Sequence, residues 1–321
     1  MAPAVRIKSV SKQYTGNYAL NGIDIDISQG SFGLIGPNGA GKTTLIKLLC
    51  GLLRPTSGTI SIMGHRPGSP EANASIGYLS ENQGYYEFNT PQQYLRYFGE
   101  LYGLSRSEMD ARIAELLKMV NLHKNARDPI STFSRGMRQR VGIARAMIHD
   151  PDIYILDEPL SGLDPIGRKE FLRILTDLKE AGRTILLSSH ELKDMDTICD
   201  EICILRQGIK IAQGNPNTLI AGAKGAHETL SFNLHSPSDV LARLQQDIPG
   251  IISFTEIPGG FQLTIAHDPP LERKILRWLL VNKVDFSVQK HVIDSLYSYV
   301  FEEQQAVEVV DEHKDGEMEV L

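Results

Sequence analysis

The sequence has few cysteines and no long apolar run. Its three cysteines, Cys50, Cys199 and Cys203, are too few and too scattered for a disulfide framework, which favours a reducing, cytoplasmic setting. No stretch approaches the roughly 18–20 consecutive apolar residues that a membrane-spanning helix needs. Polar residues follow the first six residues at once, so no signal-peptide core is predicted. We therefore expect a water-soluble protein with an ordinary core.

The sequence also lacks an excess of positive charge. Its 321 residues include 33 basic and 39 acidic side chains, for a net charge of -6. Residues 301–321 contain eight acids and one lysine, so residues 1–300 carry 32 basic and 31 acidic side chains. A nearly neutral body argues against nucleic acid as a partner, because binding the phosphate backbone requires a basic surface. The acidic segment 304–321 is expected to be a disordered tail.

Residues 1–220 have the pattern of an α/β domain. Ile23, Ile25 and Ile27 alternate with polar residues, which predicts a half-buried antiparallel strand. The short apolar runs at 153–156 and 184–187 are typical of strands buried in a parallel sheet. Strands and helices alternate in this part of the chain, as in an α/β core.

A helical insertion is predicted from about residue 90 to residue 147. One face of its second helix is apolar and carries Ile113, Leu116, Leu117 and Val120. Ser107 is a plausible N-cap for this helix, because its hydroxyl can accept a hydrogen bond from a free N–H group of the first turn.

A second domain is predicted from residue 221 to residue 303. Glycines and a proline cluster between residues 213 and 228 and mark the boundary. The order strand, helix, strand, strand, helix, strand that follows is typical of a small ferredoxin-like α+β sandwich. The expected segments are 228–234, 237–246, 251–257, 261–266, 270–281 and 284–289, followed by a final helix at about 292–303.

The strongest functional signal is a glycine-rich loop between a predicted strand at 31–35 and a predicted helix. It reads Gly36-Pro37-Asn38-Gly39-Ala40-Gly41-Lys42-Thr43-Thr44 and matches the pattern G-x-x-x-x-G-K-[ST]. In such a loop the backbone N–H groups and the helix N-terminus face phosphate oxygens. Lys42 would reach the β- and γ-phosphates, and the Thr43 hydroxyl would bind Mg²⁺. The loop therefore predicts a nucleoside triphosphate site.

A second signal is a pair of acids at the end of an apolar strand. The strand at 153–156 is followed directly by Asp157 and Glu158. Asp157 suits the outer shell of Mg²⁺, and Glu158 suits polarisation or deprotonation of an attacking water. Such a strand end is common by itself, but together with the phosphate-binding loop it indicates triphosphate hydrolysis.

These motifs resemble those of the nucleotide-binding subunit of an ABC transporter, over residues 4 to about 220. Residues 132–140, which read T-F-S-R-G-M-R-Q-R, are similar to the Leu-Ser-Gly-Gly-Gln signature of that family. They retain Ser134 and Gly136, which the resemblance implies bind the γ-phosphate of ATP held by a second subunit. The fold implied is a P-loop NTPase core with a mixed sheet, an antiparallel β subdomain and a helical insertion.

The same resemblance assigns three more residues. Ser161-Gly162-Leu163-Asp164 looks like the D-loop, which places Asp164 beside the nucleotide. His190, after the strand at 184–189, looks like the switch histidine that contacts the γ-phosphate and orients the water. Tyr14 resembles the aromatic residue that stacks on adenine.

Two of the motifs depart from the family pattern. Glu81 stands at the Q-loop position, where many members have glutamine, and Gln83 is a less favoured alternative. A carboxylate still accepts a hydrogen bond from Mg²⁺-bound water but cannot donate one, so Glu81 joins Thr43 and Asp157 as a metal contact. In the signature, Phe133, Arg135 and Met137 replace Leu, Gly and Gln. Both departures resemble the branch whose membrane partners are ABC-2-type exporters.

The resemblance implies an ATPase that energises a transporter, with ATP and Mg²⁺ as ligands. ATP would close a homodimer, or a heterodimer with a related ATPase, against an integral-membrane permease. The chain would then lie on the cytoplasmic face of the cell membrane. The C-terminal domain would be regulatory or would hold the dimer together. The sequence does not indicate the transported substrate.

A soluble ABC-type ATPase that acts on ribosomes or DNA is the competing hypothesis. Such proteins usually carry two nucleotide domains, or a long coiled-coil insertion between the phosphate loop and the signature. Here Ser134 follows Lys42 by only 92 positions, which disfavours that class. The aromatic residues Tyr85, Tyr86 and Phe88 fit either a core or a contact with a membrane subunit.

Overall fold

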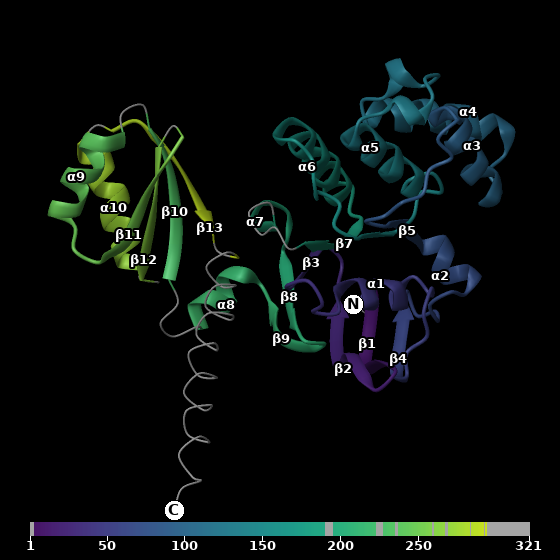
Figure 1. The fold of residues 1–321 in the computed structure, drawn as a ribbon, viewed down its shortest axis with the longest axis horizontal. Coiled ribbons are helices and arrows are strands. Elements are labelled where there is room, and N and C mark those ends of the chain that lie inside the picture. The colour runs from purple at the N-terminus through teal and green to yellow at the C-terminus, as the bar shows by residue number, and fades with distance from the viewer. Residues whose placement is uncertain are drawn as a thin grey trace, which may run out of the picture. The chain divides into compact units, whose positions relative to one another are not determined.

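The computed structural model describes residues 3–189, 195–222, 227–234, 237–258, 260–266, 269–282, 284–291 and 293. The chain divides into two compact units, Met1–Gln213 and Gly214–Leu321 (Figure 1), and each is treated by itself below. Apart from Ile293, the final helix expected at about 292–303 lies outside the described residues, and so does the acidic segment 304–321.

The first unit is built around a six-stranded sheet with the order β5-β6-β7-β3-β8-β9. Its strands are β3 (Ser31–Ile35), β5 (Ile76–Leu79), β6 (Ile153–Leu156), β7 (Thr184–Ser189), β8 (Glu201–Arg206) and β9 (Ile209–Gly214). Neighbours from β5 to β8 pair in parallel. Every residue of β3, β6 and β7 is buried, which explains why these strands are mostly apolar without alternation. The two residues between β8 and β9, Gln207 and Gly208, both have positive φ, as tight hairpins require.

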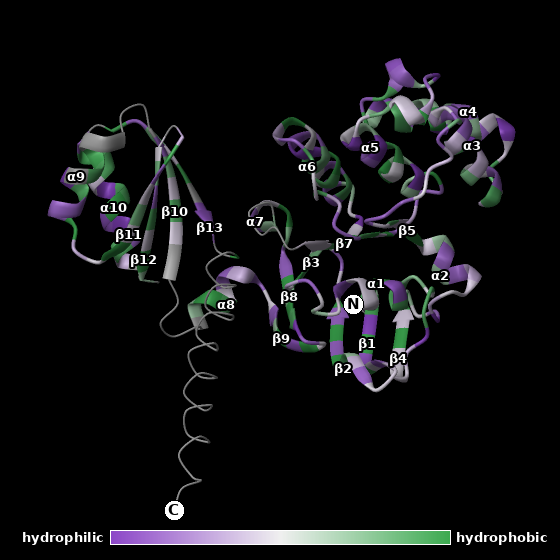
Figure 2. Ribbon diagram, in the orientation of Figure 1, coloured by the Kyte–Doolittle hydropathy of each residue, from purple (hydrophilic) through white to green (hydrophobic). Residues whose placement is uncertain are grey.

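A separate antiparallel sheet has the order β2-β1-β4. Its strands are β1 (Val5–Tyr14), β2 (Asn17–Ile27) and β4 (Ser57–Ile62). Hydrophobic and hydrophilic residues alternate along β1 and β2 (Figure 2), and Ile23, Ile25 and Ile27 are all buried, as predicted. These isoleucines belong to one hydrophobic cluster with Leu45 and Leu48 of α1 (Lys42–Leu49). The phosphate-binding loop therefore ends on a helix packed into the main core.

Three helices, α3 (Pro91–Leu101), α4 (Arg106–Met119) and α5 (Arg135–Ala146), form a helical subdomain on the side of this unit away from β1, β2 and β4 (Figure 1). The predicted apolar face of α4 is confirmed, because Ile113, Leu116 and Leu117 are buried. The other helices of the unit are α2 (Pro70–Ser75), α6 (Pro165–Glu180) and α7 (Met195–Ile198), with short 3₁₀ helices at His123–Asn125 and Ile130–Thr132. The predicted α/β class, with an antiparallel subdomain and a helical insertion, is confirmed.

The N-cap of α4 differs from the prediction. It is Ser105, not Ser107: the Ser105 hydroxyl accepts a hydrogen bond from the Glu108 backbone N–H at 3.3 Å. The Glu108 carboxylate in turn accepts from the Ser105 backbone N–H at 3.2 Å, which completes a capping box. Both serines precede the apolar face, but only Ser105 has a glutamate three residues later, as a capping box requires; at that spacing Ser107 is followed by the shorter Asp110.

The second unit has the strand–helix order predicted from the sequence. After α8 (Pro216–Gly222), it consists of β10 (His227–Leu234), α9 (Pro237–Asp247), β11 (Ile251–Ile257), β12 (Gly260–Ala266), α10 (Pro269–Val281) and β13 (Phe286–His291). The sheet order is β11-β12-β10-β13 with antiparallel pairs throughout. Each helix thus joins two strands that are not neighbours, the split βαβ arrangement of a ferredoxin-like sandwich. Leucines of α9 and α10 pack with Phe232 and Phe261 in a core of their own.

In the part of the chain that the structure describes, no helix combines the length and the apolar composition needed to cross a bilayer.

We expect Ser105→Ala to lower the free energy of unfolding by about 1 kcal/mol, because it removes the N-cap acceptor of α4. Ser107→Ala is the matched control: it lies two residues away on the same exposed turn and should change stability by less than about 0.5 kcal/mol. Urea denaturation of both variants measures the difference. Equal losses would contradict the assigned cap.

Candidate nucleotide site

The phosphate-binding loop requires glycine at two positions for steric reasons. At Gly36, a Cβ would lie 2.3 Å from the carbonyl oxygen of Leu205. At Gly41, the residue before α1, φ is +106° and a Cβ would lie 2.6 Å from the carbonyl oxygen of Ala19. Neighbouring strands therefore press on the loop from outside, which leaves its inner side to face a ligand.

Lys42, the first residue of α1, extends its buried side chain along the loop. Its ammonium donates to the carbonyl oxygen of Gly36 at 2.6 Å, and the carbonyl oxygen of Pro37 lies at 3.4 Å. The same Nζ is 3.5 Å from Oε1 of Glu158. Both side chains are less than a tenth exposed. A buried cation and a buried carboxylate therefore face each other beside the loop.

Asp157, directly after β6, is fixed on several sides. Its Oδ1 accepts from the hydroxyl of Ser188 at 2.7 Å and lies 3.4 Å from the hydroxyl of Thr43. Its backbone N–H donates to the carbonyl oxygen of Leu79 at 2.8 Å. Burial raises the pKa of Asp157, while the hydrogen bonds from Ser188 and Thr43 oppose the rise. A bound cation would stabilise this carboxylate.

Glu158 is held in a left-handed backbone conformation, with φ at +49°. Few residues other than glycine adopt this conformation, and those that do cluster at functional sites. Its backbone N–H donates to the hydroxyl of Ser188 at 2.9 Å. Ser188 thus positions both acids, and sequence analysis missed it. The available signal was a polar end to the apolar strand β7.

The loop, Glu81 and Glu158 line an open cavity of about 250 Å³. Its lining consists of Ala19, Pro37, Asn38, Gly39, Ala40, Gly41, Lys42, Thr43, Thr44, Glu81 and Glu158. The structure therefore brings Glu81, from the segment after β5, to the loop and to Glu158. Ala19 is the one lining residue absent from the predicted set, and an alanine gives no chemical signal in a sequence.

The oxygen donors fit Mg²⁺. The Thr43 hydroxyl and the Asp157 carboxylate are adjacent, Glu81 lines the same cavity, and hard divalent cations prefer such oxygen ligands. Among the residues described, no group of three or more His, Cys, Asp or Glu side chains is placed to hold a metal. Mg²⁺ commonly binds through one or two protein oxygens plus phosphates and waters, and this donor set matches that pattern.

The signature residues lie outside the lining of this cavity. Ser134 is the exposed N-cap of α5, and its hydroxyl accepts from the Met137 backbone N–H at 3.2 Å. Gly136 lies in the first turn of α5. The Arg135 side chain lies against the predicted D-loop, since a Cβ at Gly162 would be 2.5 Å from its Cζ.

Asp164 and Tyr14, which the sequence also predicts at the site, lie outside the cavity lining and make other contacts. Asp164 caps α6, where its carboxylate accepts from the Gly167 backbone N–H at 3.2 Å. Tyr14 ends β1, is 43% exposed and lies outside the cavity lining, with the ammonium of Lys12 at 5.0 Å from the ring centre. His190 lies outside the described residues.

Comparison with known proteins places this site in a family. Residues 20–161 match the family model described as ABC transporter. The chain is 36% identical to the Nod factor export ATP-binding protein I of Cupriavidus metallidurans, over 84% of this chain and 88% of the relative. It is 38% identical to an uncharacterised ABC transporter ATP-binding protein of Synechocystis and 42% identical to one of Nostoc. These two matches cover 70% and 65% of this chain but 66% and 63% of the relatives, just under two thirds of their length.

Solved structures have the same fold. One, described as the ATP-binding subunit of an ABC transporter, superposes with a TM-score of 0.63 at 34% identity, over 68% of this chain and 92% of the other. Another, an ATP-binding cassette in a dimeric post-hydrolysis state with ADP and Pi, gives 0.61 at 25% identity, over 66% of this chain and 98% of the other. The chain belongs to the ATP-binding subunits of ABC transporters.

Proposed function

We propose that this chain binds and hydrolyses ATP and so energises an ABC transporter. One observation carries the proposal: at one polar cavity, Lys42 meets Glu158 and Thr43 meets Asp157, which lies just behind the lining, and both acids come more than a hundred residues later in the sequence. A cation, a hydroxyl and two acids beside a glycine-rich loop are the groups that triphosphate hydrolysis uses.

Positioning and charge neutralisation account for the proposed chemistry. The loop N–H groups and Lys42 would hold the β- and γ-phosphates of ATP. Thr43 and Asp157 would hold Mg²⁺, with Glu81 accepting from a metal-bound water, and the ion would neutralise phosphate charge. Glu158 would orient the attacking water and accept its proton. Tyr14 would stack on adenine, and His190 would contact the γ-phosphate.

The complete site would require two subunits. Ser134 and Gly136 lie outside the cavity that contains Lys42, and the hydroxyl of Ser134 is exposed at the start of α5. We propose that these two residues, with Asp164, act on ATP held by a second copy or by a related ATPase. The dimeric structure of a related cassette with ADP and Pi supports this arrangement.

The membrane partner would be an ABC-2-type export permease, with this chain on the cytoplasmic face of the membrane. Several relatives named Nod factor export ATP-binding protein I support export, including the one that aligns with 84% of this chain. We assign permease contact to three exposed aromatic residues: Tyr86 and Phe88, which follow Glu81 in the sequence, and Tyr97 of α3, whose ring centre lies 5.6 Å from that of Tyr86. They are 54%, 93% and 43% exposed. Tyr85 is excluded, because its hydroxyl donates to the Arg138 carbonyl oxygen at 2.8 Å.

We expect Lys42→Ala to weaken binding of a non-hydrolysable ATP analogue by about 10- to 100-fold, the range for losing a charged hydrogen bond to phosphate. Lys47→Ala is the matched control, because Lys47 is an exposed lysine of the same helix. Calorimetric titration of both variants measures the effect. Unchanged affinity in Lys42→Ala would show that the loop does not bind the phosphates of ATP.

We expect Glu158→Gln to lower the ATPase rate at least about 100-fold and to leave ATP affinity within about threefold, because an amide cannot accept the proton of water. With hydrolysis blocked, ATP should convert the protein to a stable dimer, measured by light scattering after gel filtration. Turnover at the wild-type rate would show that Glu158 does not perform the chemistry.

We expect the tagged protein to co-purify from detergent-solubilised membranes of its host with a polytopic membrane protein in near-equal amount. Phe88→Ser should reduce this recovery severalfold with the ATPase rate of the isolated protein unchanged, because Phe88 is the most exposed of the large hydrophobic residues described. Ile209→Ser, at a 48% exposed position on β9, is the control. Recovery of ribosomes or nucleic acid instead would overturn the transport role and leave the ATPase chemistry standing.

A further inference from the structure

The helical subdomain is joined to the six-stranded sheet by two connections. The chain leaves the sheet after β5 and returns from α5 to β6 through residues 147–152. A Cβ on Gly77 of β5 would lie 2.3 Å from the carbonyl oxygen of Ala146 and 2.9 Å from Cγ of Pro151. The beginning of β5 thus presses against the end of α5, and we refer to this contact, where the subdomain meets the sheet, as the pivot.

His149, in the return connection, bridges the same two parts. Its Nε2 donates to the carbonyl oxygen of Ile76 at 3.0 Å, and its ring stacks on Tyr102 at the end of α3 with 3.7 Å between ring centres. Burial lowers the pKa of His149 to about 4, so the ring is neutral at pH 7. The His149 contacts therefore depend little on salt.

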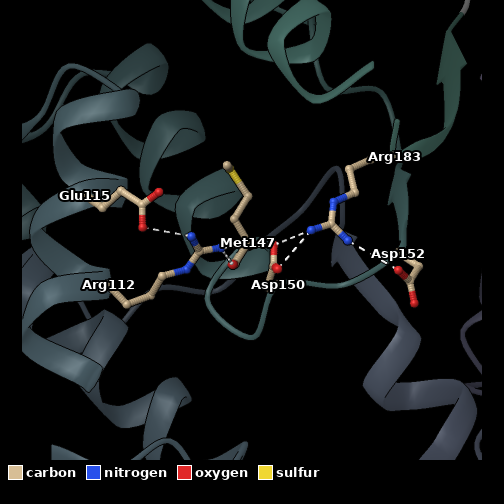
Figure 3. Close-up of polar contacts among 6 residues, drawn as sticks. All are labelled: Arg112, Glu115, Met147, Asp150, Asp152 and Arg183. Atoms are coloured by element: carbon tan, nitrogen blue, oxygen red, sulfur yellow. Dashed lines mark hydrogen bonds and ion pairs between the residues drawn. The ribbon is translucent and has the colours of Figure 1, made fainter. Parts of the chain in front are cut away.

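Asp150, the next residue, is bound by arginines from both parts (Figure 3). Arg183, just before β7, places Nη2 at 2.8 Å from both carboxylate oxygens of Asp150. Arg112, on α4, places Nη2 at 3.5 Å from Asp150 Oδ1 and donates to the carbonyl oxygen of Met147 at 2.8 Å. One carboxylate thus connects the helical subdomain to the sheet. Asp152 binds Arg183 at 3.2 Å, whereas the ion pairs of Arg112 among the described residues are with Glu115 and Asp150.

We propose that Asp150 is a positioning residue, whose ion pairs with Arg112 and Arg183 set the angle of the helical subdomain relative to the sheet. The proposal rests on the proposed function in one respect: the angle matters for catalysis because α5 carries Ser134 and Gly136. The sheet carries Asp157 and Glu158 and anchors the loop with Lys42, so the angle sets how the two halves of the site are presented to a second subunit.

The geometry amplifies small rotations at this pivot. The 12 residues of α5 span about 18 Å from the pivot at Ala146 to the signature. A rotation of about 10° there would move Ser134 by about 3 Å, and a displacement of about 1 Å can already cost about 100-fold in rate. Asp150 is 61% exposed, so its ion pairs add little to overall stability and weaken with salt. Weak ion pairs at the base of a long helix are better suited to adjusting the angle of the subdomain than to holding the fold together.

Asp150→Asn tests the link, because asparagine keeps the size and tolerates the φ of +53° at this position. Nitroxide labels at Ala111→Cys on α4 and Lys8→Cys on β1, both exposed, report the angle as a distance distribution by double electron–electron resonance. Burial raises the pKa of the thiols of Cys50, Cys199 and Cys203, so these native cysteines label slowly at neutral pH. Asp152→Asn is the matched control: it removes an equally exposed partner of Arg183 but leaves the Arg112 pair.

We expect Asp150→Asn to broaden the distance distribution at 50 mM NaCl, where wild type and Asp152→Asn stay narrow. At 500 mM NaCl, wild type should broaden to match Asp150→Asn. The ATPase kcat/KM of Asp150→Asn should fall about two- to fivefold, the range for one exposed ion pair, with unchanged affinity for a non-hydrolysable analogue.

Equal widths in wild type and Asp150→Asn would overturn the proposal, as would equal broadening in Asp152→Asn. The distance measurement needs no ATPase activity. A wild-type protein that hydrolyses no ATP would therefore refute the proposed function, while the widths would still decide the role of Asp150.

Discussion

A buried carboxylate is the constraint on which the nucleotide site depends. Asp157 is 2% exposed, so its charge is tolerated only where donors surround it. Those donors come from the hydroxyls of Thr43 on α1 and Ser188 on β7, and the Asp157 backbone is tied to Leu79 of β5. The sheet must therefore place β5, β6, β7 and β3 side by side and in parallel, because only then do their carboxyl ends meet at one edge. The order of the strands therefore brings the hydrogen-bond donors of Asp157 to one place.

Contiguous motifs were predictable from the sequence and contacts across strands were not. The loop at 36–44 and the pair Asp157–Glu158 each carry their chemistry within a few residues, and the structure brings them together. Ser188 was missed because its role depends on β7 lying beside β6, which no local pattern encodes. Ala19 was missed because only the position of β2 against the loop gives it a role. The cap of α4 was misassigned because the choice between Ser105 and Ser107 depends on Glu108 three residues after the true cap.

Periodicity predicted the C-terminal unit more closely, because β10, β12, α9 and α10 each place apolar residues in a single core. The largest difference is at β13, which begins at Phe286 instead of Val284. The backbone N–H of Val284 donates to the Leu279 carbonyl oxygen at 3.0 Å and so closes the end of α10. That group cannot also join the ladder with β10, so the strand starts two residues later. The spacing of the apolar residues of an element predicts its type, whereas competition for backbone hydrogen bonds sets its ends.

The two halves of the proposed site make opposite demands on their supports. The half with Lys42, Asp157 and Glu158 is built on buried strands, where a displaced charge would lose its partners, so its geometry is fixed by packing. The half with Ser134 lies at the N-terminal end of α5 and, in the proposed dimer, would have to move to meet a second subunit. Buried partners would lock such a helix, and an absence of partners would leave its direction undefined. Ion pairs from two partly buried arginines to the exposed Asp150 satisfy both needs, because they select an orientation and still yield to a small input of free energy.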